Sequence, residues 1–310
     1  MTYQSISVVI PTYNRVGTIR RCLDSVLSQS VQPAEVIVID DCSTDQTVEV
    51  VRSYSSPIVR CVKLSANSGA QVARNRGILE TTGTWIAFQD SDDEWLPDKL
   101  ERQVAALGEA GDDPWIVVHG DALKQQAATG RRTPFRVPAV SGEDPYSQLL
   151  SAPGPLFPSL LVSRLALDRI GPLDERVPSY QEWDTSIRLA QHCRFVHIPE
   201  PLFVYHRLPA GTISDSHEAD IAGYQYILDK FEGEIRGRCG SETWDRHMAL
   251  QWRRCLDFGR WREADEYFAQ MSTKNAKVRA LQMCRRLHVP PRRLSRLKRL
   301  ATTGYARAPD

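Results

Sequence analysis

The segment WIAFQDSDD, at residues 85–93, joins a short apolar run to a cluster of three aspartates. Four apolar residues bounded by polar ones predict a buried β-strand over residues 85–88. Asp90, Asp92 and Asp93 would then lie just beyond the carboxyl end of that strand. Their carboxylate oxygens are hard ligands that suit Mg²⁺ or Mn²⁺. Because Asp-rich segments also form polar turns, and Pro97 is well placed to begin a helix, the segment alone leaves a metal site and a simple turn both open.

On either side of this segment, strand patterns and helix patterns alternate. Apolar runs predict three more strands, at residues 6–10, 36–39 and 58–64. Helical spacing predicts four helices, at residues 19–27, 44–54, 70–80 and 97–107. Ser43 and Gln46 are spaced as a capping box for the second helix. This alternation with short links predicts an α/β fold with a mainly parallel sheet covered on both faces.

Acidic residues end two of these strands. Asp40 and Asp41 follow one apolar run, and the aspartates of residues 90–93 follow another. Ligands of parallel sheets bind beyond the carboxyl ends of the strands. We therefore expect these carboxylates to converge on one rim of the sheet.

The rest of the chain shows weaker patterns. Strands are expected at residues 115–119, 159–162, 195–198 and 202–205, with a loop or hairpin at residues 124–144. A helix should begin near Glu182, and from Asp220 onward the pattern is helical, with a helical hairpin turn at residues 259–264. The chain of 310 residues is long enough for one large α/β domain with an extension.

Composition excludes several classes of protein. The formal net charge of +1 argues against a protein built to coat nucleic acid. Seven scattered cysteines without a C-x-x-C pair argue against a disulfide framework or zinc site, and fit a reducing cytosol. We see no signal-peptide pattern and no apolar run near the roughly 20 residues of a membrane span. The G-x-G-x-x-G, G-x-x-x-x-G-K-[ST] and H-E-x-x-H motifs are absent, which counts against NAD enzymes, P-loop kinases and zinc proteases.

The C-terminal tail is basic. Between Glu266 and Asp310 the chain carries eleven lysines and arginines and no acidic residue. Leucines at 294, 297 and 300 can share one helical face among these charges, and such a helix can contact an anionic membrane. A solvated helix that packs by its leucines on the domain is the alternative. Nucleic-acid binding is poorly supported, since the segment has little aromatic content.

Two further polar segments lie at the expected rim. Asp41 can accept a hydrogen bond from a ribose hydroxyl or a base N–H, whereas Ser43 is better suited to helix capping. The turn at Gly69 leads into a helix whose N-terminal amides, or Arg74, can meet a phosphate; a plain strand-to-helix loop is the alternative.

A pair of carboxylates opens the later helix. Glu182 and Asp184 stand two residues apart, and Arg188 follows Asp184 by four. One carboxylate can serve as a general base. The other can cap the helix or pair with Arg188, and in isolation both residues fit that purely structural interpretation.

Together these segments resemble the family 2 glycosyltransferases, which have the GT-A nucleotide-sugar fold. The resemblance is carried, in order, by SVVIPTYNR at 7–15, SVLSQ at 25–29, VIDDCSTD at 38–45, residues 67–78, FQDSDD at 88–93, PDKL at 97–100, IGPLDE at 170–175 and the helix at 182–190. It covers roughly residues 5–214. It implies a GT-A, Rossmann-like domain at 1–214, with a nucleotide-sugar half at about 1–110 and an acceptor half at about 111–214. Residues 215–310 would form a helical extension with the basic tail.

The resemblance also implies residue roles. The donor would be bound by Pro11, Thr12, Tyr13, Asn14, Arg15, Asp41, Asn67, Gly69, Arg74, Asp90 and Ser91. Asp41 would meet the base, which we expect to be uracil. Asp90 and Asp92 occupy the D-x-D positions; Asp92 would hold Mn²⁺ or Mg²⁺ against the diphosphate, with Asp93 assisting. His206, in Tyr205-His206-Arg207, is a further candidate for the metal or diphosphate, although a surface histidine fits as well.

The resemblance places the catalytic base at the second residue of an acidic pair, which here reads Gln181-Glu182. Glu182 is therefore the expected base and Asp184 the alternative.

The implied reaction is inverting transfer of a sugar from a nucleotide-sugar, expected to be a UDP-sugar, to an acceptor hydroxyl on a glycan or lipid-linked saccharide. Bacterial surface polysaccharide or lipopolysaccharide synthesis is the expected setting. We expect the protein in the cytoplasm, with peripheral contact to the inner face of the plasma membrane open through the tail. The alternatives are a catalytically silent nucleotide-sugar-binding protein, which the Glu182 replacement favours, and a nucleotidyltransferase, which should carry a Gly-rich loop after its first strand.

Overall fold

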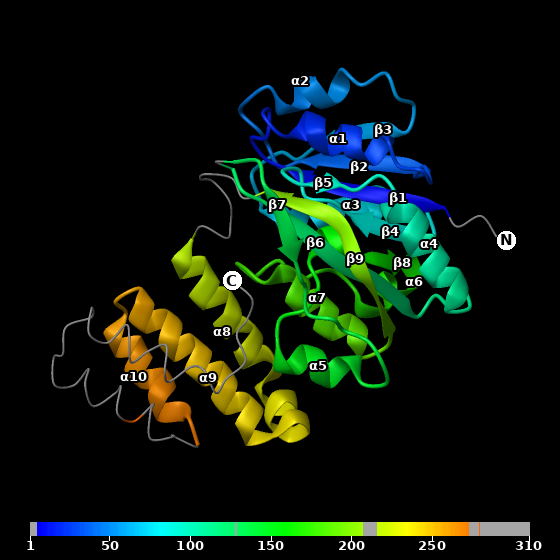
Figure 1. Ribbon diagram of the computed structural model, residues 1–310. Coiled ribbons are helices and arrows are strands. Elements are labelled where there is room, and N and C mark those ends of the chain that lie inside the picture. The colour runs from blue at the N-terminus through cyan, green and yellow to red at the C-terminus, as the bar shows by residue number, and fades with distance from the viewer. Residues whose placement is uncertain (1–4, 128, 207–215, 273–278, 280–310) are drawn as a thin grey trace. The chain divides into compact units, whose positions relative to one another are not determined.

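The structure is a computed structural model that describes residues 5–127, 129–206, 216–272 and 279. The chain divides into two compact units, Met1–Asp215 and Ser216–Asp310. The first unit contains a β-sheet with helices packed against it, and the second contains helices (Figure 1).

The sheet is mixed and mainly parallel. Among the described residues it has nine strands, in the order β3-β2-β1-β4-β8-β6-β9-β5, with β7 beside β6. Four strands are parallel: β1 (Ile6–Thr12), β2 (Glu35–Asp40), β3 (Val59–Lys63) and β4 (Trp85–Phe88). β8 (Leu161–Ser163) runs antiparallel between β4 and β6 (Ile116–Gln125), and β6 is parallel to β9 (Arg194–His206). β5 (Glu94–Trp95) is antiparallel to β9, and β7 (Arg132–Phe135) is antiparallel to β6. The expected α/β class is confirmed.

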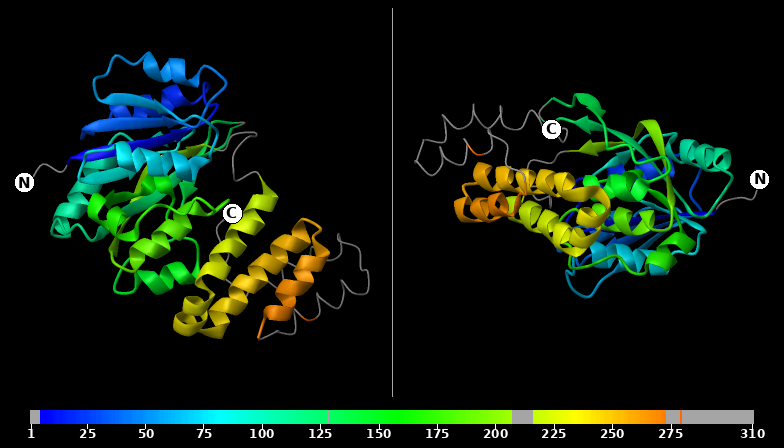
Figure 2. Two further views of the ribbon diagram at one scale, coloured as in Figure 1. Left: turned by 180° about the vertical axis from the view of Figure 1, so that it is seen from behind. Right: turned by 90° about the horizontal axis from the view of Figure 1, so that it is seen from below.

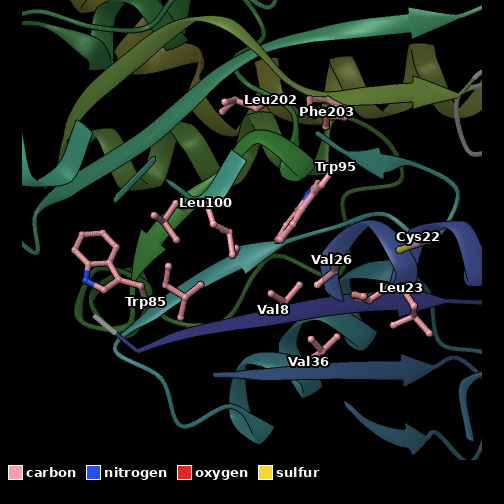
Figure 3. Packing of buried hydrophobic residues seen from close by; sticks show 14 of the residues in the cluster. Val8, Cys22, Leu23, Val26, Val36, Trp85, Trp95, Leu100, Leu202 and Phe203 are labelled. Carbon is pink, nitrogen blue, oxygen red and sulfur yellow. The ribbon is translucent and has the colours of Figure 1, made fainter. Parts of the chain in front are cut away.

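Helices pack on both faces of the parallel strands. α1 (Ile19–Leu27), α2 (Thr47–Arg52) and α4 (Lys99–Glu109) contribute to the main apolar core, in which Val26 of α1 lies beside Val8 of β1 (Figure 3). α3 (Ala70–Glu80) contributes Ala73 to a second cluster with Ile37 and Ile39. Since side chains alternate along a strand, the two clusters lie on opposite faces of the sheet. A Cβ on Gly77 would collide with Val9, so this glycine lets α3 approach the sheet closely.

Further helices follow later in the first unit. They are α5 (Pro145–Ser151), α6 (Arg164–Ile170), α7 (Gln181–Ala190) and one 3₁₀ turn, η1 (Phe157–Ser159). Sequence patterns did not predict β5, α5 or α6, which are two to seven residues long. The two strands expected at 195–198 and 202–205 are one strand, β9, whose pairing with β6 continues through a register shift near Gly120.

The predicted capping box of α2 is wrong. The helix begins at Thr47, and its N-cap residue, Gln46, makes no side-chain cap. The Ser43 hydroxyl instead accepts a hydrogen bond from the backbone N–H of Asn14, at 2.9 Å. Asp45 accepts from the Thr47 N–H, at 3.0 Å. Ser43 therefore does not cap α2, because its hydroxyl is bonded to the loop after β1.

The second unit is helical, as expected from Asp220 onward. α8 (His217–Glu234), a π-helical turn (Ile235–Cys239), α9 (Gly240–Asp257) and α10 (Trp261–Gln270) follow in order, and the three α-helices lie side by side in Figure 2. Gly259, with φ of +74°, makes the predicted turn between α9 and α10. No helix in the described part of the chain combines the length and apolar character that crossing a membrane requires. The basic segment at 289–300 lies outside the described residues.

Candidate active site

A cavity of about 420 Å³ lies at the carboxyl ends of β1, β2 and β4. This volume is in the range of small-molecule sites, which run from about 300 to 1,000 Å³. The predicted site residues that line it are Pro11, Thr12, Tyr13, Arg15, Asp41, Asn67, Gly69, Arg74, Asp90, Ser91, Asp92, Asp93, Glu182 and His206. Two predicted residues, Asn14 and Asp184, lie outside the lining. The expected convergence of carboxylates from two strand ends is therefore present in the fold.

Asp41 builds part of the cavity wall through its backbone contacts. Its two carboxylate oxygens accept hydrogen bonds from the backbone N–H groups of Ser68, at 2.7 Å, and Gly69, at 2.8 Å. Gly69 has a φ of +96°, a conformation that favours glycine, and it immediately precedes α3. Asp41 thus fixes the loop that enters α3. Each carboxylate oxygen has a second acceptor site, so these bonds leave capacity for a ligand.

Asn14 joins two loops and does not reach the cavity. Its side-chain oxygen accepts from the backbone N–H of Thr44, at 2.8 Å, and its own N–H donates to Ser43. Its φ of 49° is in the left-handed region, which asparagine tolerates better than most residues. The structure therefore gives Asn14 a scaffolding contact outside the cavity lining, and its contact with the donor stays a prediction.

Asp92 faces the cavity next to the positively charged side chain of Arg15. Its carboxylate lies 3.5 Å from the guanidinium of Arg15, and its side chain is 19% exposed. Burial and the charge of Asp90 raise the pKa of Asp92, while Arg15 opposes the rise. A partly desolvated carboxylate beside a second one is a favourable place for a cation.

Asp93 and His206 hold the acidic loop against β9. The Asp93 carboxylate is buried and accepts the backbone N–H of His206, at 2.9 Å. Burial, with the charges of Asp92 and Asp90, raises the pKa of Asp93 well above its usual value. The His206 ring lies 3.2 Å from a Glu94 oxygen, and burial lowers the His206 pKa. Both residues are thus engaged in positioning the loop that carries Asp92.

Within the described residues, no three His, Cys, Asp or Glu side chains are arranged to hold a metal ion by themselves. This arrangement agrees with Mg²⁺-type sites, in which one or two carboxylates share the ion with substrate phosphates. Asp92 and Asp90 fit such a set because both line the cavity.

Arg74 lines the cavity and contacts residues from several elements. Its guanidinium donates to Asp90, at 2.7 Å, to Gln181, at 2.8 Å, and to Gln71, at 3.0 Å. The guanidinium carbon lies 4.1 Å from the centre of the Phe157 ring. The side chain is therefore held by groups from α3, α7, η1 and the loop after β4.

Glu182 lines the same cavity as the aspartates of residues 90–93 and lies in the first turn of α7. Burial raises its pKa and the charge of Arg74 opposes the rise. Asp184 is fully buried, with its carboxylate 3.7 Å from Arg188. Of the two carboxylates, Glu182 is the one that faces the cavity.

Several lining residues were not among the predicted site residues: Ala70, Ala73, Leu156, Phe157, Pro158, Ser179, Tyr180, Gln181 and Tyr205. Tyr180 is the N-cap residue of α7 and has a left-handed φ of 62°. Left-handed conformations of bulky residues are uncommon and gather at functional sites. In the sequence, the signal for these residues was a polar or aromatic residue directly before the helix of Glu182, and this signal was weak.

The fold and cavity define a GT-A type of α/β protein, and known proteins agree. Residues 7–143 match the family described as Glycosyl transferase family 2. The amylovoran biosynthesis glycosyltransferase AmsB of Erwinia amylovora is 32% identical over 243 residues, which cover 76% of this chain and 80% of AmsB. The succinoglycan biosynthesis protein ExoO of Rhizobium meliloti is 42% identical over 106 residues, which cover 34% of this chain and only 30% of ExoO. The chain belongs to the family 2 glycosyltransferases.

Solved structures share the fold. S. aureus TarS 1–349 in complex with UDP-GlcNAc has a TM-score of 0.62 at 22% identity, covering 82% of this chain and 73% of that one. The mannosyltransferase PcManGT from Pyrobaculum calidifontis, in complex with GDP-Man and Mn²⁺, has a TM-score of 0.60 at 20% identity, covering 96% and 85%. At these identities the similarity supports the architecture alone.

Proposed function

We propose that this protein is an inverting glycosyltransferase that moves a sugar from a nucleotide-sugar, with UDP as the nucleotide, to an acceptor hydroxyl. One observation carries the proposal: Asp90, Asp92 and Glu182 all line a single cavity. A diphosphate leaving group needs its charge neutralised, and an acceptor hydroxyl needs a base. The lining of this one cavity offers carboxylates for both functions.

The donor half of the cavity suits a nucleotide. Thr12, Tyr13 and Asp41 line it at the ends of β1 and β2, and the Tyr13 side chain is 39% exposed. An exposed aromatic ring can stack on a base, and the carboxylate of Asp41 can accept a base N–H. Arg15, beside Asp92, brings a cation to the diphosphate.

Asp92 would hold a divalent cation, with Asp90 as the second carboxylate. The bound cation would supply a Lewis acid that stabilises the departing nucleotide diphosphate. Arg15 adds a fixed positive charge to the same region. Asp93 and His206 serve this set by holding its loop.

Glu182 acts as the general base. Its carboxylate takes the proton of the acceptor hydroxyl as that oxygen attacks the anomeric carbon, while the bond from this carbon to the diphosphate oxygen breaks. Attack from the face opposite the leaving group inverts the anomeric centre. Holding both substrates in line within the cavity supplies a large part of the rate. The raised pKa of Glu182 makes its carboxylate a stronger base than an exposed glutamate.

Relatives suggest the biological setting. AmsB is named for amylovoran biosynthesis and ExoO for succinoglycan biosynthesis, and both products are bacterial polysaccharides. We extend this setting to the present chain. Its acceptor would be a growing glycan or a lipid-linked saccharide.

Calorimetric titration of UDP, with and without Mn²⁺, tests the donor site. We expect binding that strengthens with Mn²⁺, and we expect Asp92→Ala to remove the metal dependence. Glu143→Ala, at an exposed acid of the same unit, is the control. If GDP or dTDP binds in place of UDP, the nucleotide assignment is wrong; if no nucleotide binds, the transferase assignment itself is refuted.

A further inference from the structure

The contacts of Arg74 join residues that are far apart in the sequence. Asp90, which accepts from Nη2, follows β4, and Gln181, which accepts from Nη1, is 107 residues away from Arg74. The arginine itself is 6% exposed. A buried guanidinium with two such partners is a rigid connection, because its planar fork fixes the direction of each N–H.

Gln181 is oriented at both ends of its amide. Its oxygen accepts from Arg74 at 2.8 Å, and its nitrogen donates to the backbone oxygen of Val177 at 3.2 Å. It is also the first residue of α7 and directly precedes Glu182. The position of the Glu182 backbone therefore depends on where Gln181 is held.

Phe157 limits the movement of Arg74. Its ring lies 4.1 Å from the guanidinium carbon and is itself packed against Phe88, with ring centres 5.1 Å apart. Phe157 is 2% exposed. Because the guanidinium has an aromatic ring on one side and hydrogen-bond partners around it, a shift of Asp90 is passed to Gln181 rather than absorbed by rotation of Arg74.

We propose that Arg74 and Gln181 are positioning residues that link the donor wall at Asp90 to the proposed base, Glu182, so that donor binding orders the start of α7. This inference rests on the proposed function. The expected contact of Arg74 with a phosphate stays a prediction beside this role, since three of its five N–H groups are donated within the protein. It also assigns Gln181 a role that its sequence position did not suggest.

Hydrogen–deuterium exchange provides the first test. The backbone N–H groups of Trp183 and Asp184 donate to Tyr180 and report on the first turn of α7. In the wild-type protein, UDP with Mn²⁺ should slow exchange in residues 181–184 by about fivefold or more. In Gln181→Leu the slowing should disappear while UDP affinity stays within about twofold. Gln181→Glu should retain part of the effect, because its carboxylate still accepts from Arg74 but no longer donates to Val177.

Turnover provides the second test, with release of UDP from a UDP-sugar as the readout. Gln181→Leu should lower kcat about 10- to 100-fold through misplacement of Glu182, with little change in the KM for the donor. Gln191→Leu, at the exposed other end of α7, and Arg76→Met, at an exposed arginine of α3, should behave as wild type.

Arg74 variants separate its geometry from its charge. The charged groups that face Glu182 are Arg74, on α3, and Asp90, after β4. Arg74→Lys keeps the positive charge but loses the fork, so kcat should fall with the acid limb of its pH profile unmoved. Arg74→Met removes the charge as well, and the acid limb should move to higher pH.

The outcomes distinguish this inference from the proposed function. Equal slowing of exchange in the wild type and in Gln181→Leu would overturn the link, as would loss of UDP affinity in Gln181→Leu. If the wild type binds no nucleotide at all, the proposed function fails and the link fails with it.

Discussion

The carboxylate of Asp41 accepts the backbone N–H of Gly69 at 2.8 Å, and its second oxygen accepts that of Ser68. This residue therefore has a structural role before any nucleotide arrives. Asp41→Ala should lower the free energy of unfolding by about 1 kcal/mol, since the backbone N–H groups of Ser68 and Gly69 lose a charged acceptor. It should also weaken UDP binding, because the loop at Gly69 lines the cavity.

Chemical unfolding and UDP titration of the same variants measure these two effects of Asp41. Glu143→Ala is again the control. A variant with normal stability and weakened UDP binding would contradict the loop role and leave Asp41 as a ligand for the base alone.

Glu182 and Asp184 should respond to substitution in opposite ways. Glu182→Gln removes the proposed base and should lower kcat about 10²- to 10⁴-fold, with UDP affinity unchanged. Asp184→Asn should instead destabilise the fold, because this buried carboxylate lies 3.7 Å from Arg188. Single-turnover rates, UDP titration and unfolding curves separate these effects. If Asp184→Asn abolishes turnover without loss of stability, the base is misassigned.

Much of the aspartate-lined part of the cavity could be predicted, because it depends on local patterns. The strand at 85–88 and the helix at 70–80 have the predicted bounds, and parallel strands bring their carboxyl ends to one edge. The aspartates that follow two of those strands therefore had to meet.

The contacts around Gln181 could not be predicted in the same way. The hydrogen bond between Arg74 and Gln181 spans 107 residues, and no local pattern encodes it. Phe157 lies in one 3₁₀ turn, too short for periodicity to show. The failed capping box has the same cause, since Asn14 reaches Ser43 across 29 residues.

The left-handed backbone of Tyr180 should make its replacement by glycine less costly than its replacement by alanine. Alanine pays the steric penalty of a φ near 62°, and glycine does not. We expect Tyr180→Gly to be more stable than Tyr180→Ala by about 1 kcal/mol. Thermal or chemical unfolding of the pair measures the difference. A glycine variant that is the less stable of the two would show that Tyr180 leaves this conformation in solution.

Stability should fall in acid partly because of His119. Its ring on β6 is fully buried and lies 2.9 Å from the backbone oxygen of Val140. Burial lowers the pKa of His119 to about 4, and the neighbouring His197 adds to this effect. The unfolded chain has the ordinary histidine pKa of about 6.5, so it takes up the proton first.

The contribution of neutral His119 to the free energy of unfolding is therefore fully present above about pH 6.5. It is lost as the pH falls from there to about 4. This gap corresponds to about 3 kcal/mol of unfolding free energy.

His119→Gln keeps a donor for Val140 and does not titrate. Urea unfolding at several pH values should show the variant gaining about 3 kcal/mol relative to wild type between pH 7 and 4. His192→Gln, at an exposed histidine, should show no such gain. A constant difference between wild type and His119→Gln across this range would mean that the folded protein protonates His119 as readily as the unfolded chain does.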